Sequence, residues 1–142
     1  MNKLLLDTDV VLDFFLDRQP FAEDAARILA LCEKKQLQVF VTPVLISNVY
    51  YILRKLGSHN KVITHLKQLL TLVEIASIQK AEVLEALASD FVDFEDALQH
   101  FAAKSETGMQ LIITRNLKDY SQSSLAVMTP SAFLKAREAR GG

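Results

Sequence analysis

The chain has 142 residues and 50% of them are hydrophobic, which suits one domain with a substantial core. The 16 lysines and arginines nearly balance the 17 aspartates and glutamates, so the net charge of -1 neither indicates nor excludes a nucleic-acid partner. The single cysteine, Cys32, excludes an internal disulfide and a cysteine-based zinc site, and we expect it to be a buried side chain in a reducing cytoplasm.

Short apolar strands alternate with amphipathic helices along the chain. In chain order the pattern predicts a strand at 3–6, helices at 10–16 and 21–35, a strand at 38–42, helices at 43–56 and 60–70, a strand at 73–78, helices at 80–88 and 93–106, strands at 111–114 and 125–128, and a last helix from Pro130. Strands separated by helices imply parallel pairing. We therefore predict an α/β fold, a three-layer α/β/α sandwich with a parallel central sheet, as one domain over 1–140 with a loose tail at 141–142.

Two features of the apolar segments bear on location. The longest apolar stretch, 39–53, is interrupted by polar residues and is shorter than the ~20 residues that span a bilayer. The N-terminal apolar run contains Asp7, Asp9 and Asp13 and has no small-residue cleavage site behind a basic start. We expect neither a transmembrane helix nor a secretory signal, and hence a cytoplasmic protein.

Charges are unevenly distributed along the chain. Between Lys34 and Val73 there is no acidic residue, whereas acidic residues dominate from Glu82 to Glu106. A basic band beside an acidic cluster is what a phosphodiester substrate and a metal would each require. The alternative is that both runs are solvated helix faces, and this alternative is favoured for the outer residues of each run.

Acids and amides follow two of the predicted strands and open one helix. These residues are Asp7 and Asp9 after the first strand, Arg115, Asn116 and Asp119 after the strand at 111–114, and Asp93, Glu95 and Asp96 at the helix start before that strand. In an open parallel sheet, ligands bind at the carboxyl ends of the strands. Converging carboxylates repel one another, and Mg²⁺ or Mn²⁺ with hard oxygen ligands is the usual reason that they are tolerated.

Each of these residues also has a purely structural interpretation. Asp7 can cap the following short helix, and Asp93 with Asp96 resembles a capping pair. Asp7 differs from a simple cap because it ends a buried strand, where a carboxylate needs a partner. Asn116 and Asp119 are common turn formers. The co-occurrence of these residues at one edge favours the functional interpretation.

Asn48 stands apart from the acids. It lies in the apolar stripe of the predicted helix 43–56 and so faces inward. It is either a hydrogen-bonded core amide or a residue that binds or orients a ligand.

Four segments of the chain combine into one pattern: LLLDTDVVLDFF at 4–15, DFEDALQHFAA at 93–103, LIITRNLKDY at 111–120 and VMTPSAFL at 127–134. Together they resemble the PIN domain, the ribonuclease fold of the toxins in VapBC toxin-antitoxin pairs. The resemblance implies hydrolysis of RNA with Mg²⁺ or Mn²⁺ bound through Asp7, Asp96 and the Asn116 position, with Asp119 close by. It also implies a homodimer and an antitoxin protein that inserts a basic side chain into the acidic site.

The chain departs from the family pattern at one position. The family's second acid, a Glu on the helix after the second strand, falls near Ser47 and Asn48, and ISNVYYILRK at 46–55 resembles a bacterial branch of PIN-like proteins. The charges of two carboxylates only balance one divalent ion. We therefore expect either that Asp93, Glu95 or Asp119 completes the set of metal ligands, or that the site binds a single metal weakly.

The predicted mechanism assigns a role to each candidate. Asp7 and Asp96 hold the metal with Asp93 or Asp119, while Asn116 and Asn48 orient ligands or water. Candidates for holding the RNA backbone are Arg54, Lys55, Lys61 and Lys67, with Arg115 at the scissile phosphate.

Two other functions remain open from the sequence. One is a PIN-like module that binds RNA or protein without cutting, which the missing helix acid favours. The other is a phosphatase of the haloacid dehalogenase type, because LLLDTDV at 4–10 has the strand-then-Asp-x-Asp form of its nucleophile motif. Such enzymes also need a Gly-Asp pair, and none of the four glycines is followed by Asp, so we rank the phosphatase well below the nuclease.

Overall fold

Parallel strands form one central sheet in the computed structural model, which describes residues 2–141. The strands are β1 (Asn2–Leu6), β2 (Leu37–Val41), β3 (Glu74–Ile75), β4 (Met109–Ile113) and β5 (Ala126–Met128). The helices are α1 (Thr8–Phe15), α2 (Ala22–Glu33), α3 (Pro43–Arg54), α4 (His59–Leu70), α5 (Lys80–Ala88), α6 (Phe94–Ser105), the 3₁₀ helix η1 (Leu117–Tyr120) and α7 (Pro130–Ala139). The strand order is β3-β2-β1-β4-β5, so β1 is the central strand.

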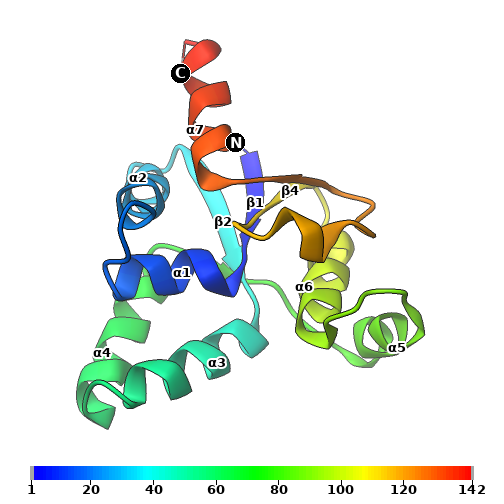
Figure 1. Cartoon of the computed structure of the whole chain (residues 1–142), viewed down its shortest axis with the longest axis horizontal. Helices are drawn as coiled ribbons and strands as arrows, with labels where there is room; N and C mark the ends of the chain where they lie inside the picture. The colour runs from blue at the N-terminus through cyan, green and yellow to red at the C-terminus, as the bar shows by residue number, and fades with distance from the viewer. Residues whose placement is uncertain (1, 142) are drawn as a thin grey trace.

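Helices cover both faces of the sheet. Leu4 and Leu6 of β1 pack in a core cluster with residues of α1, α2, α3, α4 and α7, whereas Leu5 points to the other face and packs with Phe40 and Ile112 near α6. In Figure 1 the strands run through the middle, with α1 and α2 on one side and α5 and α6 on the other. The predicted three-layer α/β/α sandwich with a parallel sheet is confirmed.

Side-chain caps start helices directly after strands. The Thr42 hydroxyl accepts a hydrogen bond from the Leu45 N–H at 3.1 Å, and Pro43 occupies the first turn of α3, where its missing N–H costs nothing. Thr129 and Pro130 repeat this arrangement at the start of α7. Both helices therefore begin at the carboxyl edge of the sheet.

The strand order reverses at β1, which creates the switch point where ligands bind in such sheets. The chain passes from β1 to β2 on one side, and β4 later joins β1 on its other side. Leu6 pairs with Ile113, and the Asp7 N–H donates to the Ile113 carbonyl at 2.9 Å. The residues that follow β1 and β4 consequently lie side by side.

Most predicted ends lie within two residues of the observed ones, and three differences stand out. β3 has two residues in place of 73–78, because it is the edge strand with a partner on one side only and both of its residues are exposed. α1 begins at Thr8 and not at residue 10, because Asp7 caps it. The turn after β4 contains η1, which the sequence analysis treated as a loop.

Several smaller expectations also have outcomes. Cys32 is buried as expected, and its burial raises the pKa of the thiol to about 11. In the part of the chain that the structure describes, no helix has both the length and the apolar character to cross a membrane. Of the expected loose tail at 141–142, Gly142 lies outside the described residues.

Candidate active site

Asp7 is at the centre of a buried polar cluster at the switch point. Its side chain is 5% exposed, and its Oδ1 accepts hydrogen bonds from the Thr8 N–H at 2.8 Å and from Gln99 Nε2 at 3.0 Å. Its Oδ2 accepts a hydrogen bond from the Thr114 hydroxyl at 2.8 Å. Asp7 therefore caps α1, and it also has the buried partners that a carboxylate at the end of a buried strand requires.

Gln99 extends the cluster to the neighbouring strand end. It is fully buried on α6, and its Oε1 accepts a hydrogen bond from the hydroxyl of Thr42, the residue that follows β2. A chain of side chains thus joins the carboxyl ends of β2, β1 and β4 through α6. Gln99, Thr42 and Thr114 were not among the site residues predicted for the nuclease. The available signals were an uncharged amide on the apolar face of a predicted helix and a threonine directly after two strands.

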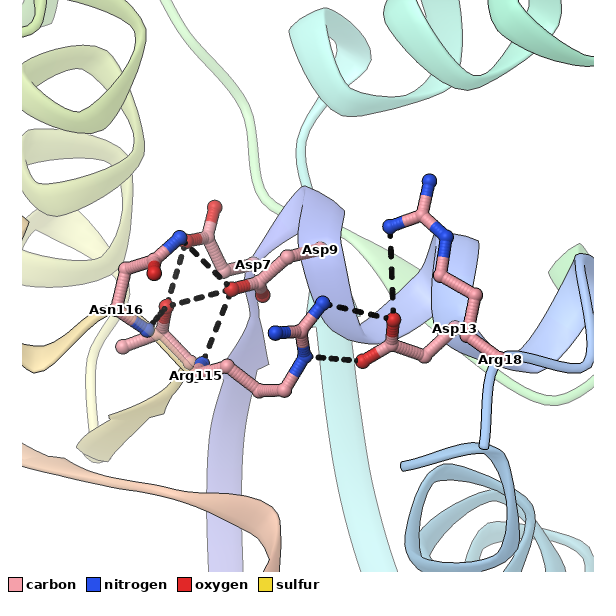
Figure 2. A network of polar contacts seen from close by, with 7 residues as sticks. Asp7, Asp9, Asp13, Arg18, Arg115 and Asn116 are labelled. Atoms are coloured by element: carbon pink, nitrogen blue, oxygen red, sulfur yellow. Dashed lines mark hydrogen bonds and ion pairs between the residues drawn. The ribbon is translucent and has the colours of Figure 1, made fainter. Parts of the chain in front are cut away.

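Asp9 is a second carboxylate in the cluster. Its Oδ2 accepts hydrogen bonds from the Arg115 backbone N–H at 3.1 Å and from Asn116 Nδ2 at 3.3 Å, as Figure 2 shows, while its buried Oδ1 has no partner among residues 2–141. Burial, followed by repulsion from Asp7, raises the pKa of Asp9 to about 6. Asn116 therefore contacts the cluster through Asp9. Asp9 was not among the predicted metal ligands.

Asp96 is a third carboxylate in the cluster and is repelled by four other acids. It is 9% exposed in the first turn of α6, and burial, then repulsion from Asp7, Asp93, Asp119 and Glu95, raises its pKa to about 8. Asp93 is the N-cap of α6, since its Oδ1 accepts a hydrogen bond from the Asp96 N–H at 3.0 Å. Asp93 and the exposed Asp119 thus lie at the rim of the cluster, close enough to raise the pKa of Asp96.

Asn48 and Glu95 meet where the family's helix acid is missing. Asn48 Nδ2 donates to Glu95 Oε1 at 2.7 Å, and the Thr8 hydroxyl donates to the same oxygen at 3.0 Å. A carboxylate from α6 is thereby held against the amide of α3. The structure brings together Asp7, Asp96, Asn116 and Asn48. They are joined by Glu95, which was one of the residues offered to complete the set of metal ligands, and by Asp9, which was not.

Comparisons with known proteins identify the family. The sequence profile described as "PIN domain" matches residues 3–118. The chain belongs to the PIN domain family. This PIN domain is 29% identical over 137 residues to Ribonuclease VapC1 of Aquifex aeolicus, with 93% of each chain covered. The resemblance inferred from the sequence motifs is confirmed.

Solved structures share the fold of this PIN domain. A toxin-antitoxin complex from Klebsiella pneumoniae contains a chain that is 22% identical with a TM-score of 0.67, covering 89% of this chain and 97% of that chain. A DNA-bound VapBC from Salmonella typhimurium contains one that is 14% identical with a TM-score of 0.68, covering 92% and 99%. At these identities the likeness concerns the fold, and the family match leaves the phosphatase alternative without support.

Arg115 is held firmly at the edge of the PIN-domain cluster. Its Nε and Nη2 donate to the two oxygens of Asp13 at 2.5 and 3.0 Å, and Asp13 is 1% exposed (Figure 2). Arg18 adds a second cation 3.6 Å from Asp13, and the guanidinium of Arg115 lies 4.0 Å from the ring centre of Phe21. The hydrogen bonds to Asp13 raise the pKa of Arg115, so its charge is permanent. Sequence analysis noted Asp13 only as an acid within an apolar run.

The other predicted RNA-binding residues lie away from the carboxylates. Arg54 ends α3 and its Nη1 donates to the Gly57 carbonyl at 3.0 Å, while Lys55, Lys61 and Lys67 are exposed at the end of α3 and along α4. Figure 1 places α4 at the carboxyl end of α3, whereas α6 lies near its amino end. These basic residues form a separate surface and do not join the acidic cluster.

The donor atoms of the PIN-domain cluster fit a divalent cation. The partnerless buried Oδ1 of Asp9, and the burial and repulsion that raise the pKa of Asp96, are features that a bound cation offsets. Within residues 2–141, no three His, Cys, Asp or Glu side chains are yet close enough together to hold an ion.

Proposed function

We propose that this PIN domain is a divalent-metal-dependent endoribonuclease and the toxin of a toxin-antitoxin pair. The observation that carries the proposal is the crowding of Asp7, Asp9 and Asp96 at the switch point of the sheet, with the pKa of Asp96 raised to about 8. Similarity to a ribonuclease over 93% of the chain supports the same chemistry.

Asp7 and Asp96 would hold Mg²⁺ or Mn²⁺, joined by Asp9, Glu95 or the rim residues Asp93 and Asp119. When bound, such an ion stabilises the negative charge that develops on the phosphate and lowers the pKa of a coordinated water. Asp7 is suited to be the fixed ligand, because Gln99 and Thr114 already hold both of its oxygens.

The remaining residues would position ligands and substrate. Asn116 and the Arg115 backbone orient Asp9, and Asn48 orients Glu95. Asp13 takes two nitrogens of Arg115, and the third, Nη1, makes no hydrogen bond to residues 2–141. Arg115 would therefore offer one preplaced donor to the scissile phosphate.

The surface formed by Arg54, Lys55, Lys61 and Lys67 would hold RNA at a distance from the cut. The side chains are exposed, and the run of sequence that contains them lacks acidic residues from Lys34 to Val73. Contacts of this kind position the backbone and do not select a sequence.

An antitoxin protein would occupy the acidic cluster in the resting state. Two structures with this fold are described as a toxin-antitoxin complex and as a DNA-bound VapBC. A basic side chain inserted between Asp7 and Asp96 would relieve the same repulsion that a metal relieves. We also expect a homodimer, as the family resemblance implies.

The decisive experiment is cleavage of a mixed single-stranded RNA by purified protein with Mn²⁺, Mg²⁺ or EDTA. The variants are Asp7→Asn and Asp96→Asn, and Asp17→Asn is the matched control because Asp17 is exposed on the loop after α1. We expect metal-dependent cutting by the wild type and the control and a loss of at least about 100-fold in both cluster variants. Equal inertness of all four proteins would contradict the proposal.

A non-cutting RNA- or protein-binding module is the second candidate, favoured by the amide of Asn48 at the position of the family's helix acid. The two candidates differ in their response to metal. A pure binding module would bind RNA equally in Mn²⁺ and EDTA and would leave the RNA intact.

A further inference from the structure

A surface cleft of about 310 Å³ lies next to the acidic cluster, and only Arg115 of its lining has a role in the proposed chemistry. It is lined by Phe21, Asp24, Arg115, Thr129, Pro130 and Ser131. Arg115 and Thr129 follow β4 and β5, which are neighbours in the sheet, so the cleft opens at the same carboxyl edge as the carboxylates. The backbone N–H of Arg115 binds Asp9 while its side chain lines the cleft, so one arginine side chain separates the two sites.

Phe21 and Arg115 form a preformed stacked pair in the lining of the cleft. The Arg115 guanidinium lies 4.0 Å from the centre of the Phe21 ring, and its two hydrogen bonds to the buried Asp13 fix its orientation. Phe21 nevertheless remains 40% exposed. Aromatic rings and arginine planes are the surfaces on which unpaired nucleobases stack, and a fixed plane loses little side-chain entropy on binding.

A carboxylate in the lining of the cleft can select among bases. The Asp24 carboxylate has a single ion-pair contact, to Arg27 at 3.8 Å, and so retains capacity to accept hydrogen bonds. A carboxylate accepts two parallel hydrogen bonds from a base that presents adjacent N–H groups, as guanine does through its ring N1–H and its exocyclic amino group. Uracil presents carbonyl oxygens beside its single N–H, and these oxygens would be repelled by the carboxylate.

We infer that this cleft binds a guanine base of the RNA, stacked on an outer face of the Phe21–Arg115 pair and read by Asp24. The inference rests on the proposed function for the identity of the polymer, since the cleft borders the site where the phosphodiester would be cut. It assigns base preference to α2 and the start of α7, which contain no metal ligand in the proposed mechanism.

The first measurement is a nuclear magnetic resonance titration of the full chain in EDTA with guanosine, inosine and uridine monophosphates. We expect guanosine monophosphate to shift the backbone signals of residues 21–24 and 129–131 and to bind about tenfold more tightly than uridine monophosphate, with inosine monophosphate, which lacks the amino group, in between. Asp24→Asn should remove this order of affinities, and Phe21→Leu should weaken all three nucleotides. Asp17→Asn is the control and should change neither.

The second measurement maps the cleavage positions on an RNA that contains every dinucleotide step. Cutting next to guanine by the wild type, spread evenly over the bases by Asp24→Asn, is the expected result. Cutting without base preference, together with no nucleotide-induced shift at these residues, overturns the inference and leaves the nuclease proposal intact. Absence of cutting with guanosine monophosphate still bound in the cleft overturns the nuclease proposal and retains the guanine site.

Discussion

Replacing Asp13 with Asn tests how the turn after β4 is held. Asp13 is 1% exposed and accepts two hydrogen bonds from Arg115, while Arg115 is partly exposed and can be rehydrated when it loses its partner. Charge-assisted hydrogen bonds of this kind contribute about 1.5–3 kcal/mol each, and breaking a fully buried pair costs about 3–5 kcal/mol. Because one partner is accessible to water, we expect Asp13→Asn to lower the free energy of unfolding by about 2–4 kcal/mol.

Thermal and guanidinium unfolding monitored by circular dichroism would measure this effect. For a domain of this length, about 1 kcal/mol corresponds to roughly 3 °C in Tm, so the expected decrease is about 6–12 °C. Asp17→Asn is the control, since Asp17 is exposed and has a left-handed backbone that Asn tolerates. The double variant Asp13→Asn/Arg115→Gln should lose less than the sum of the single variants. A single-variant loss under about 1 kcal/mol, or strict additivity, would refute the reasoning.

The other predictions concern the cluster itself. Burial and repulsion raise the pKa of Asp96 to about 8 and that of Asp9 to about 6, above their usual value near 4. Between about pH 4 and 8 the folded state therefore binds more protons than the unfolded state. The free energy of unfolding of the metal-free protein should therefore fall as pH rises from about 4 to 8, and Asp96→Asn should flatten this slope in urea titrations; an unchanged slope would contradict it. Mn²⁺ should raise Tm more at pH 8 than at pH 6, since binding requires the ionised carboxylates, and a pH-independent shift would count against the site. Gln99→Leu should cost about 2–3 kcal/mol in chemical denaturation, because two buried oxygen-bearing side chains lose their partner, and a neutral result would mean that the cluster repacks.

Local patterns in the sequence were enough to predict the layers of the fold. Alternating apolar strands and helices predicted the parallel sheet, and prolines and cap residues placed α3 and α7 directly after their strands. β3 was predicted too long, because a hydrophobic run does not reveal that its strand lies at the edge of the sheet with two paired residues.

The site residues that could be predicted were those whose charge and whose place in the predicted fold both indicated a metal ligand. Asp7 and Asp96 could be selected because they are acids at a strand end and a helix start. Gln99 and Thr114 were missed, since each contacts Asp7 from more than ninety residues away, and a buried amide or a threonine after a strand does not reveal which residue it contacts. Arg115 was predicted as a phosphate ligand, but its ion pair with Asp13 depends on α1 lying beside the end of β4.

The most direct test of the account is the rate at which a defined RNA is cut as Mn²⁺ is titrated, compared between the wild type, Asp96→Asn and the surface control Asp17→Asn, all shown to be folded. The account predicts saturable metal dependence in the wild type and the control and no measurable cutting by Asp96→Asn. Cutting by Asp96→Asn at the wild-type rate would contradict the assignment of this cluster as the active site.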